Sequence, residues 1–245
     1  MNRILLIQIF FLLQISCKAQ SYYQTIRITK DIDLMQLTSN AYIHVSYHEL
    51  PNFGRFPSNG LIYINNGEAF LFDTPITDSL TKDLTQWIID SLQVKIVGFV
   101  PNHWHDDCMG GLGYLKSIGI DSYANQMTID IAKVNGLPVP NNSFSDSLIL
   151  GLGNGQIRCY YFGAGHSLDN IVVWIPSEKI LFAGCMVKDL NSKGLGNIVD
   201  GDINEWPKTI DVLIKRFSDA KYIIPGHGTF GDKVLLEHTR SLLIQ

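Results

Sequence analysis

The chain has 245 residues, of which 46% are hydrophobic and 17% are charged, and its formal net charge is −4. This length and composition are typical of a globular chain with one large core. The low charged fraction and the lack of a lysine- or arginine-rich run argue against a nucleic acid partner. No apolar run after the N-terminal segment reaches the roughly 18 to 20 residues that a membrane span needs, so we expect no stable membrane insertion.

The N-terminal segment differs in composition from the rest of the chain. A short positive start precedes the apolar run Ile4–Leu13, and the segment ends with a small residue, Ala19. This pattern predicts a secretory signal peptide over residues 1–19 and a single exported, periplasmic domain over residues 20–245. The apolar run is too short for a membrane anchor. A lipoprotein signal at Cys17 is a minor alternative.

Periodicity and turn residues predict that strands alternate with helices along the rest of the chain. The expected strands are residues 22–28, 41–47, 60–64, 69–72, 94–100, 122–124, 147–152, 156–162, 171–175, 179–182 and 222–224. The expected helices are residues 76–92, 109–118, 127–134, 204–216 and 233–243. A loop over residues 48–57 separates the second strand from the third. Strands outnumber helices in each half, which predicts sheets packed together with helices outside, an α+β fold.

The segment from Asn102 to Cys108 contains the most chemically distinctive motif. His103, His105 and Asp107 alternate along it. On an extended or tightly curved segment, alternate side chains point the same way and can converge. Imidazole and carboxylate ligands together suit zinc or a similar ion. Taken alone, the motif is also compatible with histidines that cluster by chance in a loop.

Four metal-capable groups follow the ends of predicted apolar strands. Each strand runs into a turn that contains glycine or proline, and these turns carry His103, His166, Cys185 and His227. Ligands at the ends of buried strands are held by a rigid scaffold and can meet at one edge of a sheet. Four such coincidences favour a metal centre over a chance cluster. The same context is missing around three other histidines, which we interpret as surface or structural residues: His44, His48 and His238.

Six candidate ligands are enough for two zinc sites. One set, which would leave a position free for water as a catalytic zinc requires, is His103, His105 and His166. The other set, which includes a thiolate, is Asp107, Cys185 and His227. Zinc lowers the pKa of bound water to about 7, so the predicted chemistry is hydrolysis at a carbonyl or phosphoryl centre.

Removal of the signal peptide would leave three cysteines, Cys108, Cys159 and Cys185. An odd number in an exported protein cannot be wholly paired within the chain, so at least one thiol has another role. Cys159 lies within a predicted strand, where we expect a buried and inert side chain. Cys108 and Cys185 lie beside candidate metal ligands.

The order and spacing of these motifs resemble the class B metallo-β-lactamases, specifically their first subclass. The resemblance rests on His-x-His-x-Asp, Gly-His, Gly-Cys and Pro-Gly-His-Gly, in this order, and covers nearly the whole chain after the N-terminal segment. It implies a four-layer αβ/βα sandwich with two zinc ions at one edge of the paired sheets. It also implies hydrolysis of the β-lactam amide of penicillins, cephalosporins and carbapenems, and hence antibiotic resistance. In this reaction zinc-activated hydroxide attacks the carbonyl, and the second zinc stabilises the leaving nitrogen.

The resemblance also carries over residues that would act on the substrate. Lys188 matches the lysine that holds the substrate carboxylate, and Asn197 matches the asparagine near the lactam carbonyl. The loop Glu49–Phe56 matches a flap that covers the substrate, with Phe53 near its tip. Asp107 would be both a ligand and the residue that orients the nucleophile. We expect the enzyme to act as a monomer on a small-molecule β-lactam.

Cys108 departs from the commoner family pattern, in which arginine follows the motif's aspartate, although some members share the cysteine. A thiol at this position can change the zinc affinity of the second site, and it can oxidise in an exported protein. Two alternatives remain open. A glyoxalase-type thioesterase or a metal-dependent nuclease would carry histidine in place of Cys108 and a bridging aspartate in place of Cys185. A periplasmic zinc-sequestering protein fits the ligand count but not the open three-histidine site.

Overall fold

The computed structural model of the protein describes residues 23–50 and 54–244. The predicted signal peptide over residues 1–19, the alternative lipoprotein site at Cys17 and the flap residue Phe53 lie outside the described residues. Within the described ranges, no helix combines the length and the apolar character that crossing a membrane requires.

One sheet comes from the N-terminal half of the chain. Its strands, in spatial order, are β1 (Thr25–Thr29), β2 (Ile32–Gln36), β3 (Ala41–Leu50), β4 (Gly54–Asn65), β5 (Glu68–Phe72) and β6 (Lys95–Val100). Neighbouring strands are antiparallel up to β5, whereas β5 and β6 are parallel. A parallel pair needs a crossover connection, which the helical segment between β5 and β6 supplies.

The second sheet comes from the C-terminal half. Its strands, in spatial order, are β13 (Tyr222–Pro225), β12 (Ile180–Gly184), β11 (Val172–Ile175), β10 (Gly155–Tyr160) and β9 (Ser147–Leu152). A small parallel pair consists of β7 (Tyr123–Asn125) and β8 (Asn142–Phe144). Every residue of β11 and β12 is buried, which explains why these strands read as continuous apolar runs rather than as an alternating pattern.

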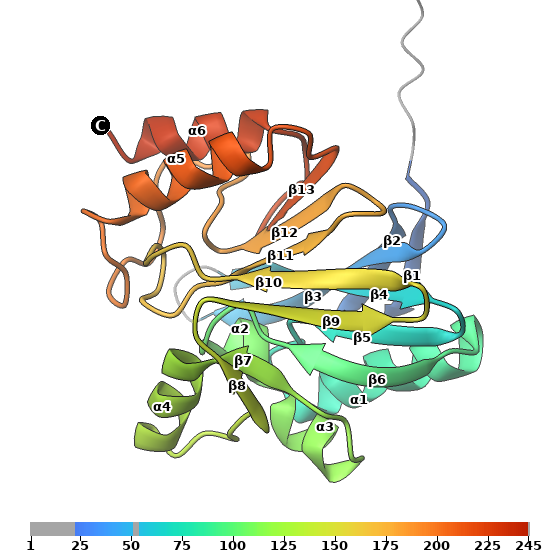
Figure 1. Ribbon diagram of the computed structural model, residues 1–245. Helices are drawn as coiled ribbons and strands as arrows, with labels where there is room; N and C mark the ends of the chain where they lie inside the picture. Colours follow the sequence, from blue (N-terminus) through green and yellow to red (C-terminus); the bar gives the residue numbers. More distant parts are fainter. Residues whose placement is uncertain (1–22, 51–53, 245) are drawn as a thin grey trace, which may run out of the picture.

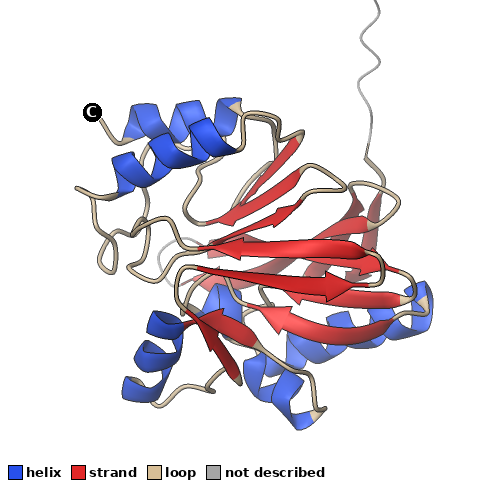
Figure 2. Cartoon of the chain, in the orientation of Figure 1, coloured by secondary structure: helices blue, strands red, loops and turns tan. Residues whose placement is uncertain are grey.

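The helices cover the outer faces of the two sheets. They are α1 (Asp78–Trp87), the π-helical turn η1 (Ile88–Leu92), α2 (Asp106–Met109), α3 (Leu112–Ser117), α4 (Gln126–Val134), α5 (Trp206–Arg216) and α6 (Val234–Leu242). Figure 1 shows α5 and α6 along one sheet and α1 and α3 along the other. Figure 2 shows the two sheets lying between these helical layers. The predicted four-layer sandwich is therefore confirmed.

Apolar side chains fill each of the three spaces between layers. The central core lies between the sheets, where Phe72 of the first sheet meets Phe182 of the second at a ring centroid distance of 6.5 Å. A second cluster packs α1 and α3 against the first sheet, and a third packs α5 and α6 against the second. These cores make both sheets rigid up to the edge where the loops begin.

Strand β2, which contains an aspartate, was missed by the sequence prediction. Asp33 accepts a hydrogen bond from Arg27 at 2.9 Å, directly across on β1. This cross-strand ion pair offsets the weak strand preference of aspartate. The predicted loop over residues 48–57 is also wrong at both ends, since β3 continues to Leu50 and β4 begins at Gly54.

Two predicted helices are shorter than expected for local reasons. Thr77 caps α1, because its hydroxyl accepts a hydrogen bond from the Leu80 N–H at 3.2 Å. The predicted helix over residues 109–118 divides into α2 and α3. A Cβ on Gly111, between them, would overlap the side chain of Thr81, so this glycine lets α3 pack closely against α1.

Candidate metal centre and active site

The six predicted ligands come together at one edge of the two sheets. His103 follows β6, His105 directly precedes α2, and Asp107 lies in α2. His166 lies beyond β10, Cys185 follows β12, and His227 follows β13. The strands β12 and β13 are parallel neighbours, so their C-terminal ends meet at the same edge of the sheet. This register places Cys185 beside His227.

The first triad is a cluster of three imidazoles. His105 Nδ1 lies 2.8 Å from His103 Nε2 and 3.3 Å from His166 Nε2. Burial and the neighbouring histidines hold the pKa of His103 well below its usual range. Burial, together with the charge of Lys188, lowers the pKa of His166 to about 3. His103 and His166 are therefore neutral at pH 7, and their ring nitrogens can offer lone pairs to a metal ion.

The second triad differs in charge. His227 Nε2 lies 3.3 Å from Cys185 Sγ and 3.3 Å from Asp107 Oδ2, and these last two atoms are 3.8 Å apart. A hydrogen bond from Cys108 holds the pKa of Cys185 well below its usual range; burial opposes this shift, and the charges of His227 and Lys188 support it. Burial lowers the pKa of His227, but Cys185 and Asp107 outweigh burial and raise the pKa to about 9. Burial and the charge of Cys185 raise the pKa of Asp107, so the triad combines a carboxyl group and a histidine with a thiol whose pKa is lowered.

Both triads fit zinc. In tetrahedral zinc, two nitrogen ligands lie about 3.3 Å apart, and a nitrogen and a sulfur about 3.5 Å apart. The nitrogen separation of 3.3 Å in the first triad and the nitrogen–sulfur separation of 3.3 Å in the second are close to these values, whereas the nitrogen separation of 2.8 Å in the first triad is shorter. A further group of donor atoms within 4.8 Å of one another spans both triads, namely those of His103, His166 and Cys185. The two triads therefore adjoin.

A fully buried side chain, Asn102, connects the ligand-bearing loops. The backbone N–H of Asn102 donates to Asp73 Oδ1 at 2.5 Å, and its side-chain Nδ2 donates to the Ile171 carbonyl at 2.6 Å. Its own Oδ1 accepts from Asn170 Nδ2 at 2.5 Å. Gly184 has φ +56, and a Cβ there would overlap the Asn102 amide, so glycine is required where this loop approaches. One buried amide thus ties loops of both sheets together.

Strand β4 holds the loop that carries His227. His227 Nδ1 lies 2.8 Å from the Pro57 carbonyl oxygen. A carbonyl can only accept, so Nδ1 carries a proton and Nε2 is the nitrogen that faces the other ligands. Asn59 makes three hydrogen bonds of 2.8 to 2.9 Å to carbonyl oxygens in the same loop, those of Pro225, Gly226 and Gly228.

His105 has two neighbours outside its triad. Asp200 Oδ2 lies 3.0 Å from His105 Nε2, and the Trp104 ring lies edge-on to the imidazole at a centroid distance of 4.7 Å. An imidazole that donates one N–H to a carboxylate is fixed in the tautomer that offers its other nitrogen to a metal. Because Asp200 follows Asn197 in the same loop, this contact also links that loop to the first triad.

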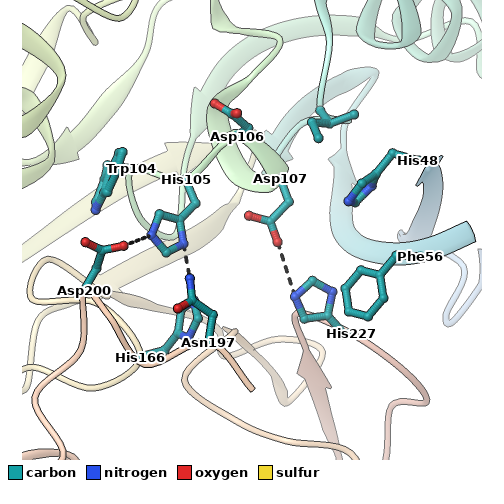
Figure 3. A pocket seen from close by; sticks show the side chains of 11 residues that line it. His48, Phe56, Trp104, His105, Asp106, Asp107, His166, Asn197, Asp200 and His227 are labelled. Carbon is teal, nitrogen blue, oxygen red and sulfur yellow. Dashed lines mark hydrogen bonds and ion pairs between the residues drawn. The ribbon is translucent and has the colours of Figure 1, made fainter. Parts of the chain in front are cut away.

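A cavity of about 410 Å³ opens over the two triads (Figure 3). Its lining comes from both halves of the chain and consists of His48, Phe56, Ile76, Trp104, His105, Asp106, Asp107, His166, Asn197, Asp200 and His227. Asn197 thus borders the cavity, and its Oδ1 accepts a hydrogen bond from the Val199 N–H at 3.1 Å. Lys188 is not part of this lining: it is 9% exposed, and its Nζ lies 5.3 Å from the Trp206 ring centroid.

The three remaining histidines have different environments. His44 is buried, with Nε2 3.2 Å from the Asp73 carbonyl oxygen, and His238 Nε2 lies 3.1 Å from the Ser192 carbonyl oxygen. Neither residue borders the cavity. His48 lines the cavity instead, and its Nδ1 is buried without a hydrogen-bond partner within the described part of the chain.

The cysteines outside the triads also differ from each other. Cys108 is 1% exposed, and its Sγ lies 3.2 Å from His103 Nδ1 and 4.0 Å from Asp107 Oδ1. It therefore touches one ligand of each triad, whereas the sequence had suggested an effect on the second site alone. Cys159 is fully buried in the central core, and burial raises the pKa of its thiol to about 12. This thiol is inert at neutral pH.

Comparisons with known proteins agree with this geometry. The family model of the metallo-β-lactamase superfamily matches residues 53–227. The chain is 51% identical over 222 residues to metallo-β-lactamase type 2 of Bacteroides fragilis, covering 91% of this chain and 89% of that protein. It is 37% identical over 217 residues to metallo-β-lactamase type 2 of Bacillus cereus, covering 88% and 84%. A solved metallo-β-lactamase from Pontibacter korlensis superposes with a TM-score of 0.85 at 37% identity, covering 87% of this chain and 99% of that one.

The chain belongs to the metallo-β-lactamase superfamily. Its relatives place it in the first subclass, as the order of the ligand motifs had implied.

Several supporting residues escaped the sequence reasoning. Asn102 adjoins His103, so its place in the motif was a usable signal. Asn59 is a polar residue directly before the predicted strand over residues 60–64, which is also a signal. By contrast, Asp200 is separated from His105 by 95 residues, and no spacing pattern links the two.

Proposed function

We propose that this protein is a zinc-dependent β-lactamase that binds two zinc ions, hydrolyses the β-lactam amide bond and so confers antibiotic resistance. One ion would bind at the first triad, His103, His105 and His166. The other would bind at the second triad, Asp107, Cys185 and His227.

The observation that carries this proposal is the convergence of two triads with different donor atoms at one cavity. A zinc-sequestering protein would not need a cavity of about 410 Å³ beside its ligands. A thioesterase or nuclease of this fold would need a histidine and a bridging carboxylate where the chain has Cys108 and Cys185. Both of these residues are buried thiols: Cys185 belongs to the second triad, and Cys108 lies beside His103.

Zinc bound at the triads would lower the pKa of a water molecule and stabilise negative charge on the leaving nitrogen. The chain's own residues would position the reactants. Asp107 stands at the junction of the triads, where a carboxylate oxygen can accept a hydrogen bond from water and orient it. The Oδ1 of Asn197 already accepts from Val199, so its Nδ2 is available to donate to the lactam carbonyl.

Lys188 would supply a fixed positive charge for the substrate carboxylate. Burial lowers the pKa of its ammonium, and the charges of Cys185 and Asp107 act in the opposite direction. A cation at this depth attracts the anionic end of a β-lactam toward the second triad. It therefore acts against the unfavourable net charge that the protein presents to an anionic substrate, which is −4 for the full sequence and −4 − 2 = −6 without Arg3 and Lys18 of the signal peptide.

The proposed substrates include penicillins, cephalosporins and carbapenems. The DIM-1 metallo-β-lactamase exposed to ceftazidime, a cephalosporin, is a crystal structure that matches this chain with a TM-score of 0.83 at 37% identity. The proposed mature protein is a monomer with a single domain over residues 20–245. It would act in the periplasm after removal of the signal peptide over residues 1–19.

The test uses the purified chain from residue 20 to residue 245. The protein is made metal-free with a chelator and reloaded with zinc, and hydrolysis of one penicillin, one cephalosporin and one carbapenem is measured together with the zinc content. We expect chelator-sensitive hydrolysis and two zinc ions per chain. A folded, zinc-loaded protein that leaves all three substrates intact would contradict the proposal.

A matched pair of variants connects the activity to the site. His103→Ala and His238→Ala each remove one imidazole, but only His103 belongs to a triad, whereas His238 contacts the Ser192 carbonyl away from the cavity. We expect His103→Ala to abolish measurable hydrolysis and His238→Ala to retain it. Equal losses in both variants would show that the activity does not depend on the triads.

A further inference from the structure

Three aromatic rings, those of His48, Phe56 and His227, lie in successive contact at the second triad (Figure 3). The Phe56 ring lies against the imidazole of His227, with centroids 4.8 Å apart and planes tilted by 55°. Phe56 also meets His48 edge-on at a centroid distance of 5.9 Å. His48 and Phe56 lie directly opposite each other on β3 and β4, so the backbone of one hairpin sets the positions of both rings.

Phe56 packs against His227 and restrains rotation of its imidazole ring. The hydrogen bond between His227 and Pro57 leaves this rotation free. The bond from Nδ1 to the Pro57 carbonyl, at 2.8 Å, determines which nitrogen carries the proton. A single hydrogen bond tolerates a broad range of angles, and the torsion that rotates an imidazole ring is soft. The lone pair of Nε2 lies in the ring plane. Packing against the ring must therefore determine where that lone pair points.

His105, at the other end of the cavity, offers a natural comparison. Outside its triad it also has one hydrogen-bond partner and one aromatic neighbour among the described residues, namely Asp200 at 3.0 Å and Trp104 at a centroid distance of 4.7 Å. The partner of His105 is a charged carboxylate, whereas that of His227 is a neutral backbone carbonyl. Because a carbonyl restrains an imidazole less strongly than a carboxylate does, His227 depends more on its aromatic neighbour.

We propose that Phe56 is a positioning residue that sets the zinc affinity of the second site by fixing the ring plane of His227. His48 supports Phe56 from the facing strand. It acts through packing, since its buried Nδ1 has no hydrogen-bond partner among the described residues. The inference rests on the proposed function, because it takes Asp107, Cys185 and His227 as zinc ligands.

The test is a titration of the metal-free chain with cobalt(II), a spectroscopic substitute for zinc. Cobalt bound at the second site would absorb through its bond to the Cys185 thiolate, and cobalt bound at the first site would show only nitrogen ligands. Outer residues that orient a ligand typically change metal affinity 10- to 100-fold. We expect Phe56→Ala to weaken the thiolate-bearing site about 10-fold and to leave the nitrogen site unchanged.

Graded variants distinguish ring positioning from general packing. Phe56→Tyr retains a planar ring and should restore the affinity of the second site. Phe56→Leu retains apolar volume without a planar face and should restore it only partly. His48→Ala should weaken the site less than Phe56→Ala does. Trp104→Ala is the reciprocal control, and it should weaken the nitrogen site while the thiolate absorption keeps its native affinity.

Circular dichroism and thermal unfolding show which variants are folded, and Phe56→Leu replaces Phe56→Ala if the latter unfolds. Native second-site affinity in the folded variant would overturn the inference. Full affinity in Phe56→Leu beside a loss in Phe56→Ala would also overturn it, since volume rather than ring plane would then be the cause. If the native chain itself lacks thiolate absorption with cobalt, the assigned second site fails, and with it the proposed function.

Discussion

The two ligand triads differ in charge and in the part of the fold that supports them. The first consists of imidazoles, two of which have a pKa well below the usual range. The second combines a thiolate, a carboxylate and a histidine. The first is supported by Asn102 and Asp200 in neighbouring loops. The second is supported by strand β4 of the opposite sheet, through Pro57 and Asn59.

This difference shows how one edge of a sandwich can hold two ions for different tasks. Three neutral ligands leave the charge of a divalent ion uncompensated, which keeps it effective at lowering the pKa of water. A thiolate and a carboxylate neutralise the ion formally, so the second triad would bind largely through charge. We therefore expect the loss of a charged ligand to weaken zinc binding at the second triad strongly. The loss of a supporting contact should weaken zinc binding at either triad less.

Cys185→Ser tests the second triad and should have the largest effect. Serine is neutral at pH 7 and a poor zinc ligand, so the triad loses both a soft donor and a negative charge. We expect the folded variant to retain one zinc and to lose at least about 100-fold in kcat/KM, because even residues behind the ligands can cost this much. Zinc analysis and steady-state hydrolysis provide the measurement.

Cys159→Ser makes the same chemical change away from the triads. Cys159 is fully buried in the central core, so serine should lower thermal stability while the protein keeps its full zinc content. Near-native turnover in Cys185→Ser, with the zinc content also unchanged, would refute the assigned second triad.

Asp200→Ala tests the support of the first triad and should have an intermediate effect. The change removes the carboxylate 3.0 Å from His105 Nε2, so the imidazole loses its fixed tautomer and orientation. We expect about a 10-fold loss of zinc affinity at the first triad, measured by competition with a chromophoric chelator. Asp200→Asn keeps an acceptor without the charge and should recover part of the affinity. Native affinity in Asp200→Ala would show that the contact does not orient the ligand.

The contrast between ligands and supports also explains what the sequence could predict. Ligands of both triads follow strand ends, where an apolar run and a turn are visible in the sequence, so the six residues and the layered fold could be identified. The residues that support the ligands do not share this pattern of strand ends and turns. Asp200 is 95 residues from His105, and Asn59 contacts a loop 166 residues away through Pro225. Only the packing of the two sheets brings these residues together.

Two features of the fold depend on tertiary contacts that local sequence patterns do not show. No strand was predicted over residues 32–36, where the ion pair between Asp33 and Arg27 joins β2 to β1. His48 lacks a neighbouring glycine or strand end, so it was interpreted as a surface or structural residue. The continuation of β3 to Leu50 places it on the cavity wall. The length of the hairpin formed by β3 and β4 therefore determines where His48 lies, and local turn residues define that length poorly.

His44→Gln tests a deeper support of the first triad and should have the smallest effect at neutral pH. His44 contacts the Asp73 carbonyl, and Asp73 in turn holds the Asn102 N–H directly before His103. Burial lowers the pKa of His44 to about 4, although hydrogen bonds to the Asp73 and Phe72 backbone oppose this shift. The imidazole is thus neutral in the folded chain but protonates near pH 6.5 in the unfolded chain.

The sign of the pH dependence follows from this difference. The unfolded state binds the extra proton below about pH 6.5, so the stability contributed by neutral His44 is complete above that pH and declines toward pH 4. We expect the free energy of unfolding of the metal-free native chain to fall by about 2 kcal/mol more than that of His44→Gln between about pH 7 and pH 5. Urea unfolding of both proteins at the two pH values measures this difference. Subtracting the change in the variant from the change in the native chain cancels the contributions of the titratable groups that both proteins contain. Parallel pH dependences would show that His44 does not remain neutral in the fold.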